Sequence, residues 1–179
     1  MTSNNVRRIV TGFDATGRST IIEDGPATAV KTVPERPGYF SANLWRTSST
    51  PADIFESSNI EEHVGVSPPN SGTVLRVIEI PPQPKDKKER ERQARATFSN
   101  MFPDADQSHG QNIDPGMHQT DTVDYAIILE GEMFAVMEES ETLMRAGDVL
   151  IQRGTNHAWA NRSDKACRVA FILIDGERN

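Results

Sequence analysis

Short runs of alternating apolar and polar residues, separated by turn residues, fill the first quarter of the chain. The runs are "VRRIVTG", "TIIEDG" and "YFSANLWRT", and "DATGRS" separates the first two. β-branched and aromatic runs bounded by Gly, Asp and Ser are typical of strands, and a short polar connection favours a hairpin. The pattern therefore predicts a hairpin and a further strand between residues 6 and 48.

The middle of the chain predicts a loop, a strand and a helix. Residues 49–71 are rich in Ser, Pro and Asn, which favours a long loop. The run "GTVLRVIEIPP" is typical of a strand that two prolines end. Residues 84–102 are good helix formers with charges of both signs, and Pro84 suits a first helical turn. Mixed charge indicates a solvated surface helix rather than a binding surface.

The last third, residues 117–175, is almost continuous strand and tight turn. The run "YAIILEG" is apolar on both faces, as in a strand at the middle of a sandwich or barrel, and Gly131 permits a tight turn. Residues two apart in an extended strand share a face. The polar set that could line a cavity in this way is His118, Thr120, Thr122 and Asp124. The fold class is therefore predicted as all-β with one helical insertion.

The composition restricts the class of protein. A chain of 179 residues, with 36% hydrophobic and 25% charged residues, is typical of one globular domain. The net charge of −7 and the pI near 5.1 disfavour phosphate backbones, so no nucleic-acid partner is expected. Cys167 is the only cysteine, which fits a reducing compartment. Without a signal-like segment or a long apolar run, we expect a cytoplasmic protein with no membrane partner.

Two turn-bounded units carry a characteristic spacing. In the first, Gly131 lies seven residues after Asp124. In the second, "RAGDVLIQRGTNHAWAN", a Gly-Asp turn and a short strand lead to a second turn, and Asn161 lies four residues after His157. These units resemble the paired motifs of the cupin superfamily. Three positions depart from the family pattern. Asp124 replaces the glutamate of the first motif, Thr120 stands where that motif has its second histidine, and Gln152 stands where the second motif usually has a proline.

The resemblance implies a single cupin domain over residues 1–179, a jelly-roll β-barrel or sandwich with the helical insertion near the barrel rim. The N-terminal strands and loop would occupy 1–83, the helical insertion and its loop 84–116, and the core motifs 117–175. It also implies a homodimer formed through edge strands, for which residues 6–24 provide material.

By the same resemblance, a metal site would use His118, Asp124 and His157. Two imidazoles and a carboxylate suit Fe, Mn, Ni or Zn and leave positions open for water and substrate. The alternative is a polar network, or acid and base groups, without a metal. No nucleotide cofactor is expected. His109 is interpreted as an exposed loop histidine, and His63 has still less claim to the site.

Other residues are candidates for contacts with a small-molecule substrate. Trp159 lies two residues after His157, so it would share the cavity side and offer a flat apolar wall. Arg76 lies between Val74 and Ile78 on one strand face and could hold a substrate carboxylate. The remaining candidates are Trp45, Tyr125 and Gln152.

For function, the resemblance favours a metal-dependent small-molecule enzyme of the lyase type. It would decarboxylate, dehydrate or isomerise a small oxo or hydroxy acid or a polyketide-like compound, with Asp124 and His157 as catalytic groups. One alternative is an Fe(II)-dependent dioxygenase acting on an aromatic or other small organic substrate. Another is a metal-free cupin that binds a ligand. The fold alone does not choose among these chemistries.

Overall fold

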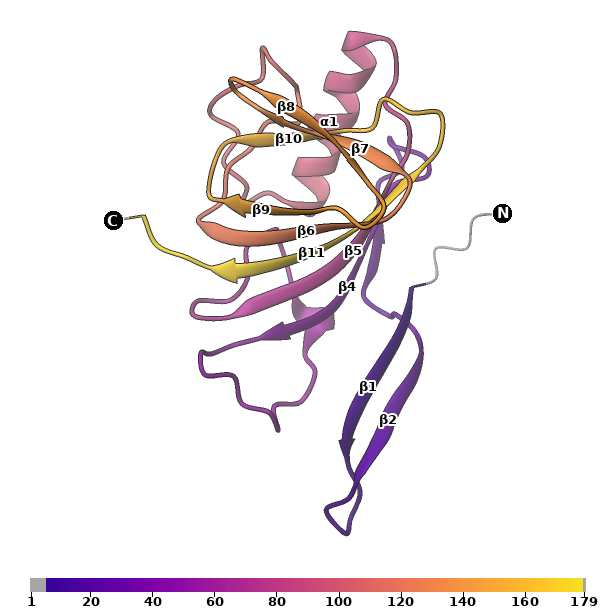
Figure 1. The fold of residues 1–179 in the computed structure, drawn as a ribbon, viewed down its shortest axis with the longest axis vertical. Helices are drawn as coiled ribbons and strands as arrows, with labels where there is room; N and C mark the ends of the chain where they lie inside the picture. The colour runs from indigo at the N-terminus through magenta and orange to yellow at the C-terminus, as the bar shows by residue number, and fades with distance from the viewer. Residues whose placement is uncertain (1–5, 179) are drawn as a thin grey trace.

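Two antiparallel sheets pack face to face in the computed structural model, which describes residues 6–178 (Figure 1). The larger sheet has the strand order β3-β4-β5-β11-β6-β9, and the smaller has the order β10-β7-β8. The bounds of the larger sheet are β3 Val30–Thr32, β4 Phe40–Thr47, β5 Thr73–Ile80, β11 Cys167–Asp175, β6 Thr122–Glu130 and β9 Val149–Arg153. Those of the smaller are β10 His157–Ala160, β7 Glu132–Met137 and β8 Glu141–Arg145.

The core lies between these sheets. Buried side chains of β5 and β11, such as Ile78 and Val169, belong to one apolar cluster with Met133 and Met144 of β7 and β8. Sheets packed in this way bury the alternate side chains of each strand. The all-β jelly roll with a helical insertion, predicted from the sequence, is confirmed.

Strand β6 lies between β11 and β9, and its two faces differ. Asp124, Ala126 and Ile128 are buried, whereas Tyr125 and Leu129 are 39% and 49% exposed. The interpretation of "YAIILEG" as apolar on two buried faces is thus wrong for its outer face. After β6, Gly131 has φ +78°, and an added Cβ would lie 2.7 Å from the carbonyl oxygen of Ala166. Only glycine fits that turn without strain.

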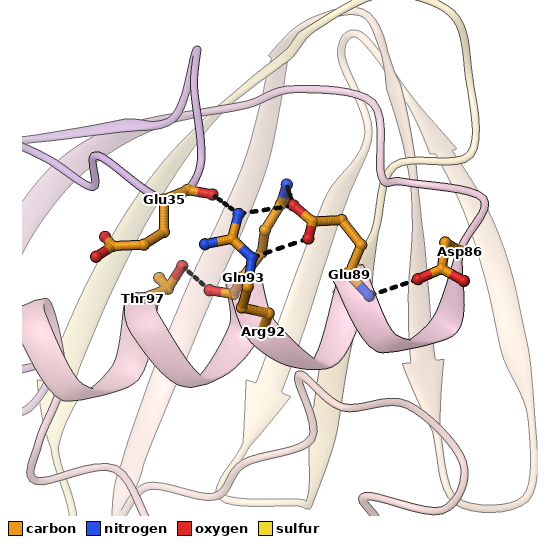
Figure 2. A network of polar contacts seen from close by, with 6 residues as sticks. All are labelled: Glu35, Asp86, Glu89, Arg92, Gln93 and Thr97. Carbon is orange, nitrogen blue, oxygen red and sulfur yellow. Dashed lines mark hydrogen bonds and ion pairs between the residues drawn. The ribbon is translucent and has the colours of Figure 1, made fainter.

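The helix α1 runs from Lys87 to Met101, shorter than the predicted range of 84–102. Asp86 caps it, because its carboxylate accepts a hydrogen bond of 2.9 Å from the backbone N–H of Glu89 (Figure 2). Pro84 therefore precedes the helix and does not belong to its first turn. The described helices include none long and apolar enough to cross a membrane.

On its outer side, α1 is joined to the loop before β4. The guanidinium of Arg92 forms two hydrogen bonds of 2.8 Å with the Glu89 carboxylate and donates a third, of 3.1 Å, to the backbone carbonyl of Glu35 (Figure 2). This link matters for the site, because both α1 and the loop at residues 33–39 contribute to the cavity wall.

The hairpin of β1 (Arg7–Phe13) and β2 (Ser19–Pro26) extends away from the two packed sheets (Figure 1). Arg8 joins the two strands of the hairpin through an ion pair of 2.6 Å with Glu23 and connects the hairpin to the loop that follows β4 through a hydrogen bond of 2.8 Å to Ser58. Large apolar side chains along the hairpin are exposed, with fractions of 51–62%; they are Ile9, Phe13, Ile21 and Ile22. A two-stranded hairpin alone is marginally stable in water.

The homodimer stays a prediction, which the hairpin makes testable. We expect sedimentation equilibrium to give roughly twice the chain mass of 19.8 kDa, because a second copy would cover the apolar side chains of the hairpin. The double variant Phe13→Ser, Ile22→Ser should shift the equilibrium toward the single chain, whereas Lys88→Ser on α1 should not. A wild-type protein that sediments as one chain at all concentrations would contradict the dimer.

Candidate functional site

A cavity of about 120 Å³ opens between the larger sheet, β10 and α1. The side chains of both predicted histidines, His118 and His157, line it, as does Asp124 of β6. Arg76 of β5 and Trp159 of β10 line the same cavity. The structure therefore brings these five predicted residues together around one cavity.

The two histidines are held side by side by the backbone. Each donates its backbone N–H to the carbonyl of the other, at 2.9 and 3.0 Å, and their ring centroids lie 4.3 Å apart. The Nδ1 of His118 lies 2.9 Å from the carbonyl of Gly116, and that of His157 lies 3.0 Å from the carbonyl of Thr155. A carbonyl only accepts, so each Nδ1 carries the proton and each Nε2 is the acceptor nitrogen.

Both imidazoles are neutral at ordinary pH. Burial lowers the pKa of His118, and burial together with the neighbouring His118 lowers the pKa of His157 to about 3. A neutral ring whose Nδ1–H bonds a carbonyl is the state in which histidine ligates a metal or accepts a proton through Nε2.

Asp124 is the buried carboxyl group of the cavity, with 4% of the residue exposed. Its Oδ1 has no hydrogen-bond partner within the described part of the chain. Burial raises its pKa to about 6, against the opposing effects of Thr122 and Arg76. Thr120, which replaces the second histidine of the first motif, also lines the cavity, and its hydroxyl lies 2.7 Å from that of Thr122. Buried polar atoms are usually hydrogen-bonded, so this unpartnered oxygen makes Asp124 a candidate functional group.

The predicted ligands have the donor types of a divalent-metal site but not its arrangement. Across residues 6–178, no three side chains of His, Cys, Asp or Glu come close enough together to hold an ion. The two imidazoles are adjacent, and the carboxylate of Asp124 does not join them. The metal site of His118, Asp124 and His157 therefore stays a prediction.

Aromatic side chains form the apolar wall. The ring of Trp159 meets that of Phe171 edge-on at 5.2 Å and that of His157 at 5.5 Å. Phe98 of α1 lies 5.0 Å from the ring of His118. One face of α1 therefore lines the cavity, which corrects the interpretation of this helix as a solvated surface element without a binding role.

Three candidate substrate contacts lie outside this cavity. Tyr125 follows Asp124 directly on β6, so its side chain points to the outer face. Gln152 is buried, and its amide donates to the carbonyl of Thr155 at 2.7 Å, so it fixes the turn before His157. Trp45 lies on β4 with the guanidinium of Arg8 over its ring. The structure therefore does not bring these three residues together with the residues that line the cavity.

The two histidines outside the motif units, His63 and His109, differ in burial. His109 is exposed in its loop, as predicted. His63, which follows the 3₁₀ turn η1 (Ile60–Glu62), is 3% exposed and contacts Arg76. No pattern in the sequence indicates the burial of His63, because its position depends on how a long irregular loop packs. Cys167 is fully buried, and burial raises the pKa of its thiol to about 11, as expected of a packing residue.

Residues 107–174, which contain both motif units, match the family model of the cupin domain. This segment of the chain is therefore similar to the cupin domain. The chain is 28% identical over 180 residues to phomopsin biosynthesis cluster protein C' of Diaporthe leptostromiformis, covering 95% of this chain and 78% of that protein. It is 24% identical to the cupin-domain-containing oxidoreductase fogC of Aspergillus ruber, covering 96% of this chain and 73% of that protein.

Among solved structures, the Schizosaccharomyces pombe Cnp3 cupin domain is similar with a TM-score of 0.45 and 12% identity. The match covers 94% of this chain and 87% of that one.

Elemental analysis tests the predicted metal site of this protein. His118→Ala and His157→Ala should each lower the content of Fe, Mn, Ni or Zn in the purified protein, because each removes a neutral imidazole that can ligate through Nε2. His109→Ala is the control and should leave the metal content unchanged. Equal loss in all three variants would show that the ligand assignment is wrong.

The burial of His63 predicts a pH dependence of stability. Its pKa falls to about 4 in the folded protein, through burial and the neighbouring Arg76, from an ordinary value near 6.5. Between these values the unfolded chain binds more protons, so the free energy of unfolding should fall as the pH falls from about 6.5 to about 4. Urea unfolding across this range should show a shallower dependence for His63→Gln, and an unchanged one for the exposed control His109→Gln.

Proposed function

We propose that this protein is an enzyme of small-molecule biosynthesis of the lyase type, which moves a proton on a substrate bound in the cavity. The observation that carries the proposal is Asp124: a buried carboxyl group with an unpartnered oxygen, in a cavity that also holds neutral imidazoles and a guanidinium. Such an arrangement suits acid–base chemistry on an oxo or hydroxy acid.

Asp124 would take or give the proton. With a pKa near 6, both its forms exist close to neutral pH, so it can act as base or acid. As a base it would remove a proton from the carbon next to a carbonyl, which leads to isomerisation, or to dehydration when hydroxide leaves from the adjacent carbon. As an acid it would protonate the carbon from which carbon dioxide departs.

The other groups would orient the substrate. His157 carries its proton on Nδ1, so its Nε2 would accept a hydrogen bond from a substrate hydroxyl. Arg76 would receive an acidic group, and Trp159 would lie against an apolar ring or chain. The relatives support an enzyme of this general kind, because one of them is named for the biosynthesis cluster of phomopsin.

A second candidate is an oxidoreductase that uses Fe(II) and dioxygen. Its support is the adjacent pair of neutral imidazoles, together with the name of the Aspergillus ruber relative. The two candidates differ in their consumption of oxygen. An oxygen electrode, read in the same samples as the release of carbon dioxide, therefore separates them.

Asp124→Asn tests the proton transfer. Because asparagine keeps the shape but cannot exchange the proton, we expect the rate to fall about 10²–10⁴-fold. The assay follows release of carbon dioxide and uptake of solvent deuterium by mass spectrometry, on a panel of small 2-oxo, 3-oxo and hydroxy acids. Asp121→Asn, on an exposed residue of the preceding loop, is the matched control. Full activity in Asp124→Asn would exclude Asp124 as the acid or base.

A further inference from the structure

We propose that the cavity takes an organic monoanion, a carboxylate attached to an apolar ring or chain, and that His63 is the positioning residue that holds Arg76 ready to bind it. The inference rests on the proposed function in one respect, the orientation of an acid by Arg76. It adds the charge and class of the substrate and assigns a role to a residue outside both cupin motifs.

Arg76 is buried without a carboxylate in contact. It is 1% exposed on β5, and it lines the cavity. Its Nη2 donates to the carbonyl of Val66 at 2.8 Å and to Nε2 of His63 at 3.1 Å, and its Nη1 lies 3.4 Å from the carbonyl of Gly65. These three acceptors are uncharged. In residues 6–178, no carboxylate oxygen lies within 4.0 Å of its guanidinium, and its Nε has no partner.

The guanidinium of Arg76 is thus in direct contact with dipoles only, and the carboxylates of Asp104 and Asp124 act on its charge from a distance. Burial lowers its pKa to about 10, so the guanidinium remains protonated at neutral pH. A buried cation without a counter-ion is costly, and a carboxylate that enters the cavity would relieve this cost. The whole chain carries a net charge of −7, so the attraction for an anion is local to this site.

The loop that presents these acceptors is fixed before any ligand enters. Gly65 has φ +86°, and a Cβ there would clash with the carboxylate of Asp104. That carboxylate accepts hydrogen bonds from the backbone N–H groups of Val66, at 2.8 Å, and Ser67, at 2.9 Å. The carbonyls of Gly65 and Val66 are thus turned toward Arg76 by a clamp on the other side of the loop.

His63 contributes the only side-chain acceptor among the three. Arginine has no acceptor, so Nε2 of His63 must accept from Nη2 and its Nδ1 must carry the proton. The neutral ring persists at ordinary pH, because burial and Arg76 both disfavour the imidazolium. His63 therefore fixes the direction of the guanidinium and leaves its positive charge in place. An aspartate at the same position would neutralise that charge.

The aromatic side chains that line the rest of the cavity would contact the apolar part of the ligand. Trp159, Phe98 and Phe102 contribute aromatic surface, and the guanidinium of Arg76 lies 5.4 Å from the ring centroid of Phe102. Arg36 and Arg90 also line the cavity, but both are partly exposed, as is the acidic Asp114. Within residues 6–178, Arg76 is therefore the one fully buried cation of the cavity. One buried cation beside aromatic walls fits one acidic group on an apolar body better than a polyanion or a neutral sugar.

Calorimetric binding of matched probes at pH 7.5 tests the inference. The probes are benzoate, cyclohexanecarboxylate and hexanoate, each paired with its uncharged amide. At least one carboxylate should bind the wild-type protein more tightly than its amide. His63→Phe, which removes the acceptor, should weaken the carboxylate about tenfold and leave the amide unchanged. His63→Gln, whose amide oxygen can accept from Arg76, should restore most of the affinity, and the control His109→Phe should have no effect.

Each result bears on the proposal. Amides that bind as tightly as the acids, or the failure of every carboxylate at millimolar concentration, would overturn the anionic substrate class. Carboxylate affinity that is unchanged in His63→Phe would overturn the positioning role. If His63→Phe does not fold, Arg76→Gln gives the second measurement, in which the preference for acid over amide must disappear. Asp124→Asn should still bind the acid, so a failure of proton transfer is distinguishable from a failure of this inference.

Discussion

The cost of burying a guanidinium governs how this barrel is built around its cavity. Arg76 sits in the middle of β5, between strands that otherwise contribute apolar side chains to the core. A charge in that position must be met by oriented dipoles, and the loop before β5 supplies them from two carbonyls and one imidazole. The conformations of Gly65 and Asp104 follow from this requirement, because together they fix the loop that carries the dipoles.

Four titratable groups that line the cavity differ in charge, and desolvation acts on all of them. At the end formed by β10 and the segment before β6, burial keeps the imidazoles of His118 and His157 neutral. On β6, burial favours the protonated form of Asp124. On β5, burial acts on a group too basic to lose its proton, so Arg76 stays charged. One low-dielectric space thus holds neutral, titrating and cationic groups together.

Local periodicity was sufficient to predict part of this site. The positions of Asp124, Trp159 and Arg76 on the cavity side agree with strand alternation, and the two motif histidines are assigned by the resemblance to the cupin motifs. Both signals depend on neighbours in sequence. The same alternation excludes Tyr125, which is adjacent to the inward-facing Asp124. His63 and the lining face of α1 were beyond this reasoning. Their positions depend on the packing of a long loop and a helix against strands that are distant in sequence. No periodic pattern in the sequence indicates such contacts.

The link from Arg92 to the carbonyl of Glu35 has a kinetic consequence. It joins the helix that carries Phe98 to the loop that carries Arg36 and Tyr39, and all three side chains line the cavity. An outward displacement of α1 must either break this hydrogen bond or carry the loop along. The two walls are therefore not independent, and a ligand that left on that side would have to move both. The rate of ligand dissociation would then depend on Arg92, an exposed residue that does not line the cavity.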